Sequence, residues 1–67
     1  MDAVSIGKKL VELRGERTQQ QVARDLEISD SAICAYETGA RIPRDELKLR
    51  IAQYYGLTVG ELFFDQK

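Results

Sequence analysis

Residues 18–36 carry two helix starts with very little chain between them. The Thr18 hydroxyl can accept a hydrogen bond from the first free backbone N–H groups of a helix, and Gln21 completes the pattern of a capping box. Ser29 is a second cap of the same kind. Only residues 27–28 separate the two predicted helices, so we expect a tight turn and a near-perpendicular helix pair.

The apolar residues of this segment favour the same interpretation. Val22, Ala23 and Leu26 fall on one face of the first helix, and Ile33 and Tyr36 fall on one face of the second. When these faces pack together, the second helix protrudes from the domain. The major groove of DNA is wide enough to admit such a helix. The pattern therefore predicts sequence-specific DNA binding.

The rest of the chain predicts a single all-α domain over residues 1–67, with no strand. Gly15, Gly39 and Gly56 stand where helices are expected to end, and Thr58 with Glu61 forms a second capping box. The five expected helices run from Val4 or Ser5 to Arg14, from Thr18 to Leu26, from Ser29 to Tyr36, from about Pro43 to Gly56, and from Thr58 to Phe63.

The composition argues against several other classes of protein. Of the 67 residues, 43% are hydrophobic and 31% are charged, which is typical of a folded domain. With one cysteine, Cys34, and no histidine, neither a zinc site nor a nucleophile–imidazole pair can form. We expect no catalytic activity, no metal and no cofactor. No segment has the pattern of a signal peptide or a membrane span, and we expect a cytoplasmic protein that binds no membrane.

The net charge of −1 does not by itself indicate a nucleic-acid-binding protein, because such proteins are often strongly basic. Its distribution is more informative. Five arginines lie in or near the predicted helix pair and the loop that follows it, whereas much of the acid lies toward the C-terminal end. The sequence is compatible with a local basic face, and equally with a mixed solvated surface.

Short motifs follow one another in order along most of the chain. They are Leu13-Arg14, Thr18-Gln19-x-x-Val22-Ala23-x-x-Leu26, Ile28-Ser29-x-Ser31-x-Ile33, Tyr36-Glu37-x-Gly39, Pro43, Ile51-Ala52-x-x-Tyr55-Gly56-Leu57-Thr58-Val59 and Leu62-Phe63. With these motifs the chain resembles the lambda-repressor-like, Cro/repressor (XRE) type of helix-turn-helix regulators. The resemblance implies a compact five-helix fold, a helix-turn-helix at about 18–36, and binding to double-stranded operator DNA.

The resemblance also implies roles for individual residues. It makes 29–36 the recognition helix, and it pairs Glu37 with Arg14 as a structural ion pair. The residues expected to read bases are Asp30, Ser31, Cys34 and Ala35. The residues expected to contact DNA phosphates are Thr18, Gln19, Ser29, Arg41 and Arg44.

Two departures from the family pattern lie in the predicted recognition helix and in the turn before it. Glu27 stands where the family often has glycine, so a left-handed backbone there costs on the order of 1 kcal/mol. The predicted reading positions offer a carboxylate, a hydroxyl, a thiol and a methyl group, and lack the Arg, Asn and Gln side chains that make bidentate base contacts. We therefore expect DNA shape to supply part of the specificity.

Large apolar residues near the C-terminal end suggest self-association. The four rings of Tyr54, Tyr55, Phe63 and Phe64 are core candidates first, but they exceed what so small a chain easily hides. An exposed Leu49, Tyr54 or Phe64 would form an apolar patch, and we expect a homodimer through the last two helices. No binding site for a small-molecule effector is evident. The predicted function is a transcriptional regulator, more specifically a repressor on a pseudo-palindromic operator. The alternative is a module of the same fold, antitoxin-like or anti-regulator, that acts through a protein partner.

Overall fold

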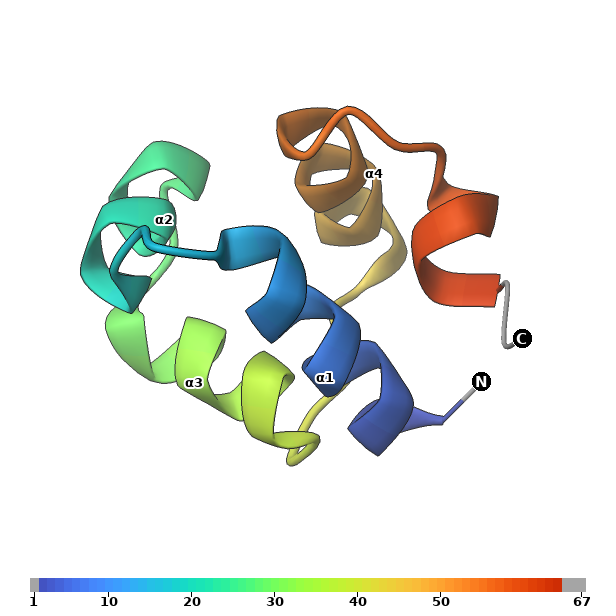
Figure 1. Ribbon diagram of the computed structural model, residues 1–67, viewed down its shortest axis with the longest axis horizontal. Coiled ribbons are helices and arrows are strands. Elements are labelled where there is room, and N and C mark those ends of the chain that lie inside the picture. The colour runs from blue at the N-terminus through green and yellow to red at the C-terminus, as the bar shows by residue number, and fades with distance from the viewer. Residues whose placement is uncertain (1, 65–67) are drawn as a thin grey trace.

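Side-chain hydrogen bonds cap the first residues of most helices in this chain, α4 excepted. In the computed structural model, which describes residues 2–64, this part of the chain contains five helical segments and no strand (Figure 1). The segments are α1 (Ala3–Arg14), α2 (Gln19–Leu26), α3 (Asp30–Thr38), α4 (Asp45–Tyr54) and a final short turn of helix, η1 (Gly60–Phe64). The prediction of an all-α fold with five helices is confirmed.

The predicted caps are present at three helix starts. The hydroxyl of Thr18 accepts from the Gln21 backbone N–H at 3.0 Å, and the hydroxyl of Ser29 accepts from the backbone N–H of the third residue after it at 3.1 Å. Before η1 the capping box is complete, because Thr58 and Glu61 each accept from the other's backbone N–H, at 3.0 and 2.9 Å. The side chain of Gln21, in contrast, makes no hydrogen bond back to the Thr18 backbone N–H within residues 2–64, so this capping box is incomplete.

Two helix boundaries differ from the prediction. The first helix begins at Ala3 because the Asp2 carboxylate, which the pattern analysis did not consider, accepts from the Val4 backbone N–H at 3.2 Å. The third helix continues through Thr38, and it stops at Gly39, whose φ of 83° lies in the left-handed region. The predicted stop at Gly39 is thus confirmed, although the helix extends two residues beyond the predicted range of 29–36.

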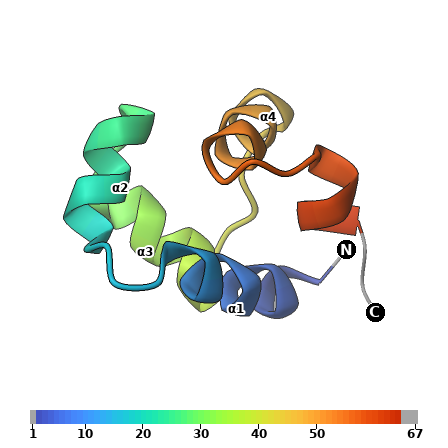
Figure 2. The ribbon, with the colours of Figure 1, turned by 45° about the horizontal axis from the view of Figure 1, so that its top comes forward.

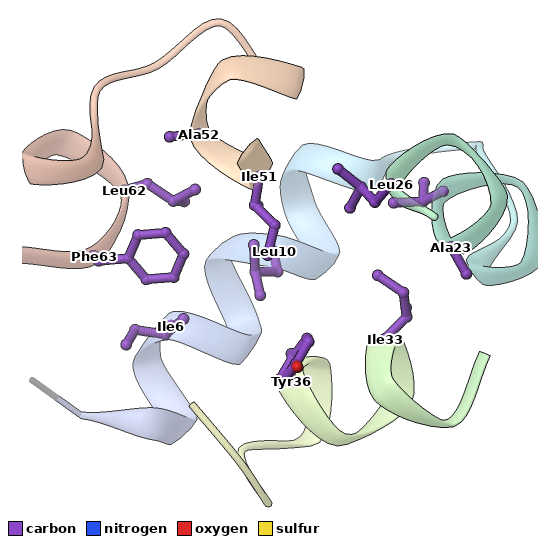
Figure 3. Close-up of a cluster of buried hydrophobic side chains, with 11 residues drawn as sticks. Ile6, Leu10, Ala23, Leu26, Ile33, Tyr36, Ile51, Ala52, Leu62 and Phe63 are labelled. Atoms are coloured by element: carbon purple, nitrogen blue, oxygen red, sulfur yellow. The ribbon is translucent and has the colours of Figure 1, made fainter. Parts of the chain in front are cut away.

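The core lies between α1, α3, α4 and η1 and continues into α2 (Figure 3). Phe63, Ile51, Leu62 and Val22 are the largest side chains within it that are fully buried. Tyr55 and Tyr54, also core candidates, are half-buried at its edge. The buried apolar residues are Ile6, Leu10, Val22, Ala23, Leu26, Ile33, Tyr36, Ile51, Ala52, Leu62 and Phe63.

α3 packs against both α1 and α2, and this connects the helices around one core. α1 packs along α3 and also contacts η1, whereas α2 packs on α3 and α4 (Figures 1 and 2). A hydrogen bond of 3.0 Å from Lys9 Nζ to the carbonyl of Glu61 joins α1 to η1. Within the described residues no helix is long and apolar enough to cross a membrane. The arrangement leaves the outer side of α3, along the lower edge of Figure 1, uncovered.

A glycine sets the close approach of α1 to α3. A Cβ atom at buried Gly7 would lie 2.3 Å from the carbonyl oxygen of Glu37 and 2.9 Å from that of Tyr36. Both neighbours are backbone atoms, so relief requires that the two helices move apart. Helical periodicity alone does not reveal this requirement, because it depends on which helix packs opposite Gly7.

We therefore predict that Gly7→Ala destabilises the domain, although alanine is the better helix former by about 0.5–1 kcal/mol. The expected loss in the free energy of unfolding is about 1–3 kcal/mol, the usual cost of overpacking. Urea denaturation followed by circular dichroism measures it. Gly60→Ala is the matched control, because a Cβ there would meet nothing closer than 3.9 Å. A Gly7→Ala variant as stable as the parent would contradict the proposed close approach.

Candidate nucleic-acid interface

The outer face of α3 carries the predicted base-reading residues. Asp30, Ser31 and Cys34 are exposed, and Ala35 is half-buried. The opposite face of the helix is in the core through Ile33 and Tyr36. The structure thus brings the four candidates to one side of one helix. Their contacts with bases stay a prediction.

The turn that aims α3 is left-handed at Glu27. Its backbone has φ 61° and ψ 42°, and among the described residues it is the only non-glycine with positive φ. Its N–H still donates to the carbonyl of Arg24 at 3.1 Å, and the Ile28 N–H donates to that of Ala23 at 2.9 Å. The Ile28 side chain is half-buried and packs against the core. The turn is thus stabilised by hydrogen bonds and packing that offset a strain of about 1 kcal/mol.

Arg50 on α4 stabilises the same turn. Its guanidinium donates a hydrogen bond to the carbonyl oxygen of Leu26, the last residue of α2, and lies 3.8 Å from the Glu27 carboxylate. A cation at a helix C-terminus also interacts favourably with the helix dipole. The sequence analysis did not identify Arg50. Only the packing of α4 beside α2 brings it to this turn.

A buried carboxylate joins the first three helices. The side chain of Glu37 is only 4% exposed, and its two oxygens accept from Arg14 Nε at 2.7 Å and Nη2 at 3.2 Å. The same carboxylate accepts from Gln19 Nε2 at 2.8 Å. The hydrogen bonds that Arg14 donates to Glu37 raise the pKa of Arg14 above its ordinary value. The expected ion pair is present, with Gln19 as an additional partner.

The N-terminus of α2 forms a second part of the candidate interface. Thr18, Gln20, Gln21 and Arg24 line an open hollow on this surface, together with Asp25. The half-buried Gln19 does not line it, because one amide hydrogen of its side chain points to Glu37. Gln19 can offer a phosphate its backbone N–H and its second amide hydrogen. Ser29 and Thr18 are both exposed, with their hydroxyls engaged as helix caps.

Arg41 and Arg44 follow the C-terminal end of α3, in the loop that leads to α4. Both are exposed, and neither has an ion-pair partner within residues 2–64. Pro43, between them, is buried and anchors the loop to the domain. The two guanidinium groups are therefore available to an anion beside the C-terminal part of α3.

The three dimer candidates are not equivalent in the structure. Leu49 and Phe64 are 50% and 56% exposed. Tyr54 is half-buried, and its hydroxyl donates to the Asp25 carboxylate at 2.6 Å, which raises the pKa of the tyrosine. Arg17 lies 5.4 Å from the centre of the same ring. Tyr54 thus joins α4 to α2 and does not extend the apolar patch.

Lys48, which no sequence pattern indicated, lies beside the exposed Phe64 ring. It is 8% exposed, and its ammonium lies 5.8 and 5.4 Å from the ring centres of Phe63 and Phe64. The exposed Asp45 carboxylate is 3.5 Å away. The aromatic rings and the carboxylate together compensate for the partial burial of this charge.

The fold and the candidate interface are those of a helix-turn-helix protein. A family model described as a helix-turn-helix domain matches residues 5–62. The chain therefore belongs to this family, and its motifs are those of the Cro/repressor (XRE) type of DNA-binding regulator.

One curated relative is the cryptic phage CTXphi transcriptional repressor RstR of Vibrio cholerae, which is 33% identical over 61 residues. The match covers 88% of this chain and 55% of the relative, so the chain spans about half the length of that protein. No solved structure matches the chain significantly.

We predict that Glu37→Gln strongly destabilises the domain. The variant removes the charge that compensates Arg14, and loss of one partner from a buried ion pair costs about 3 kcal/mol or more. Thermal and urea unfolding measure the loss. Glu12→Gln, a change at an exposed acid on α1 with no ion pair among the described residues, is the control. If both variants unfold within about 0.5 kcal/mol of the parent, the carboxylate does not hold the helices together.

Proposed function

We propose that this domain is a transcriptional repressor that inserts α3 into the major groove of double-stranded DNA. The observation that carries the proposal is the exposed outer face of α3, with two sets of possible anion contacts. The N-terminus of α2 offers one set of contacts, and the unpaired Arg41 and Arg44 in the loop after α3 offer the other. A helix in the groove with phosphate contacts on either side is the docking geometry of this motif.

Three of the four reading positions have base partners that suit their chemistry. Asp30 can accept from the amino group of cytosine, and Ser31 can contact several base edges. Ala35 can pack on a thymine methyl group, with Cys34 beside it. The absence of Arg, Asn and Gln from this face supports a share of specificity from DNA shape.

The proposed repressor acts as a homodimer on a pseudo-palindromic operator. Leu49 on α4 and Phe64 on η1 are large exposed apolar side chains in neighbouring elements, with the charges of Lys48 and Asp45 beside them. A two-fold interface joins a patch to its own copy, which a patch with both charge signs allows. Such a dimer sets two α3 helices about 34 Å apart, one turn of DNA.

Repression is proposed from the name of the relative, a phage repressor that is longer than this chain. A regulator of this kind occupies a promoter and works in the cytoplasm, where its DNA lies. The net charge of −1 and the acidic reading residue Asp30 favour a second candidate function, namely protein binding. In that alternative the same fold binds a protein partner, and binding depends little on counterion release.

The salt dependence of DNA binding separates these two functions. We predict that Arg41→Ala weakens binding to a mixed-sequence duplex and lowers the slope of log K against log salt by about one unit. Fluorescence anisotropy at several salt concentrations measures both quantities. Lys8→Ala is the control, because Lys8 is an exposed cation on α1 outside the proposed interface. An unchanged slope in Arg41→Ala would remove this residue from the DNA contact.

We predict that Leu49→Asp prevents dimer formation. A carboxylate placed at the centre of a two-fold apolar contact meets its own copy and must be desolvated. Sedimentation equilibrium of the parent and the variant measures the association constant, and we expect a loss of about tenfold or more. Val11→Asp, at another exposed apolar residue on α1, is the control. A parent that is monomeric at high micromolar concentration would contradict the dimer.

A further inference from the structure

A hollow of about 430 Å³ lies between the turn before α3, the loop after it, and α4. Three arginines line it, namely Arg41 and Arg44 from the loop and Arg50 from α4. The one carboxylate in the lining belongs to Glu46. The side chains around this hollow therefore carry a net charge of +2, from three arginines and one glutamate. The volume is within the range of small-molecule sites, about 300–1,000 Å³.

The hollow also has an apolar part. Ile28 and Leu47 are half-buried, and they line the hollow while packing on the core. Ile42 is 41% exposed and adds apolar surface from the loop. A bare phosphate would leave this surface without a contact. The lining is suited to a molecule that carries both a phosphate and an apolar or planar group.

We propose that this hollow binds a phosphate-bearing ligand, with the phosphate on the arginines and an apolar group against Ile28 and Leu47. Arg41 and Arg44 have no ion-pair partner in the described part of the chain, so no internal bond must break when an anion binds them. Guanidinium groups can hold a phosphate through paired hydrogen bonds. The phosphate can come from a small free molecule or from a nucleic-acid backbone.

The free molecule is the source that the apolar lining favours, and it gives the domain a means of control. Arg41 and Arg44 are also the residues proposed to contact DNA phosphates. A small ligand on these side chains competes with duplex DNA for them, so it acts as an anti-repressor. This competition rests on the proposed function, whereas the binding of the ligand itself does not.

The first experiment omits DNA. A titration of the ¹⁵N-labelled domain with phenyl phosphate, followed by amide chemical shifts, measures affinity and location together. Inorganic phosphate is the matched probe without the apolar group. We expect phenyl phosphate to bind about fivefold or more tightly than inorganic phosphate, because the ring covers apolar surface. The shifts should be concentrated at residues 27–28 and 40–50.

Two variants test the two halves of the site. Arg44→Gln should weaken both probes about fivefold, because it removes a charged donor from an exposed side chain with no structural bond. Ile42→Thr should weaken phenyl phosphate and leave inorganic phosphate unchanged. Lys8→Gln, with the same loss of charge outside the hollow, should change neither. Equal weak binding of both probes with shifts spread over the surface, or binding of phenyl phosphate elsewhere, would overturn the site.

A second experiment uses the domain bound to a fluorescent duplex and adds each probe at equal ionic strength. Displacement by phenyl phosphate at concentrations that leave inorganic phosphate without effect would support competition. Binding in the hollow without displacement would overturn the competition and leave the site. A domain that binds phenyl phosphate in the hollow and no duplex at all would contradict the proposed function alone.

Discussion

The arrangement of this domain depends on the hydrogen bonds that the buried Glu37 carboxylate accepts. This carboxylate is almost fully buried, and it accepts hydrogen bonds from Arg14 on α1 and from Gln19 on α2 while it belongs to α3. The backbone of the same residue lies against Gly7, where α1 and α3 approach most closely. The candidate reading face and the start of α2 are therefore positioned by one charged group. Loss of that charge leaves a partly buried arginine uncompensated.

Local patterns predicted the elements of the fold because the determinants of helix ends are themselves local. The caps at Thr18, Ser29 and Thr58 act over three residues, so the printed sequence is enough to find them. The stability of the turn at Glu27 depends on contacts that local patterns do not show. A glutamate at a left-handed position is tolerated because neighbouring backbone bonds, the packing of Ile28 and the guanidinium of Arg50 all support it.

Most features that sequence reasoning missed depend on which helix packs on which, whereas the Asp2 cap of α1 is a local contact. Gly7 is needed only because α3 lies against it, and Lys48 is accommodated only because η1 brings Phe63 and Phe64 to it. Tyr54 was a candidate for the core or for an exposed dimer contact. In the structure it is half-buried, and its hydroxyl donates to Asp25 on α2. The reading face itself was predictable, because helical periodicity alone separates Asp30, Ser31 and Cys34 from the buried Ile33 and Tyr36. Contact with DNA at these positions remains a proposal.

Selection from a randomised duplex pool tests whether α3 reads duplex DNA as part of a two-fold dimer. The domain is incubated with the pool at two salt concentrations, and the bound fraction is sequenced. The account predicts enrichment of a two-fold-symmetric sequence, with affinity that falls as salt rises. Binding no stronger than background at low salt, with no sequence enriched, would contradict it and favour a protein partner.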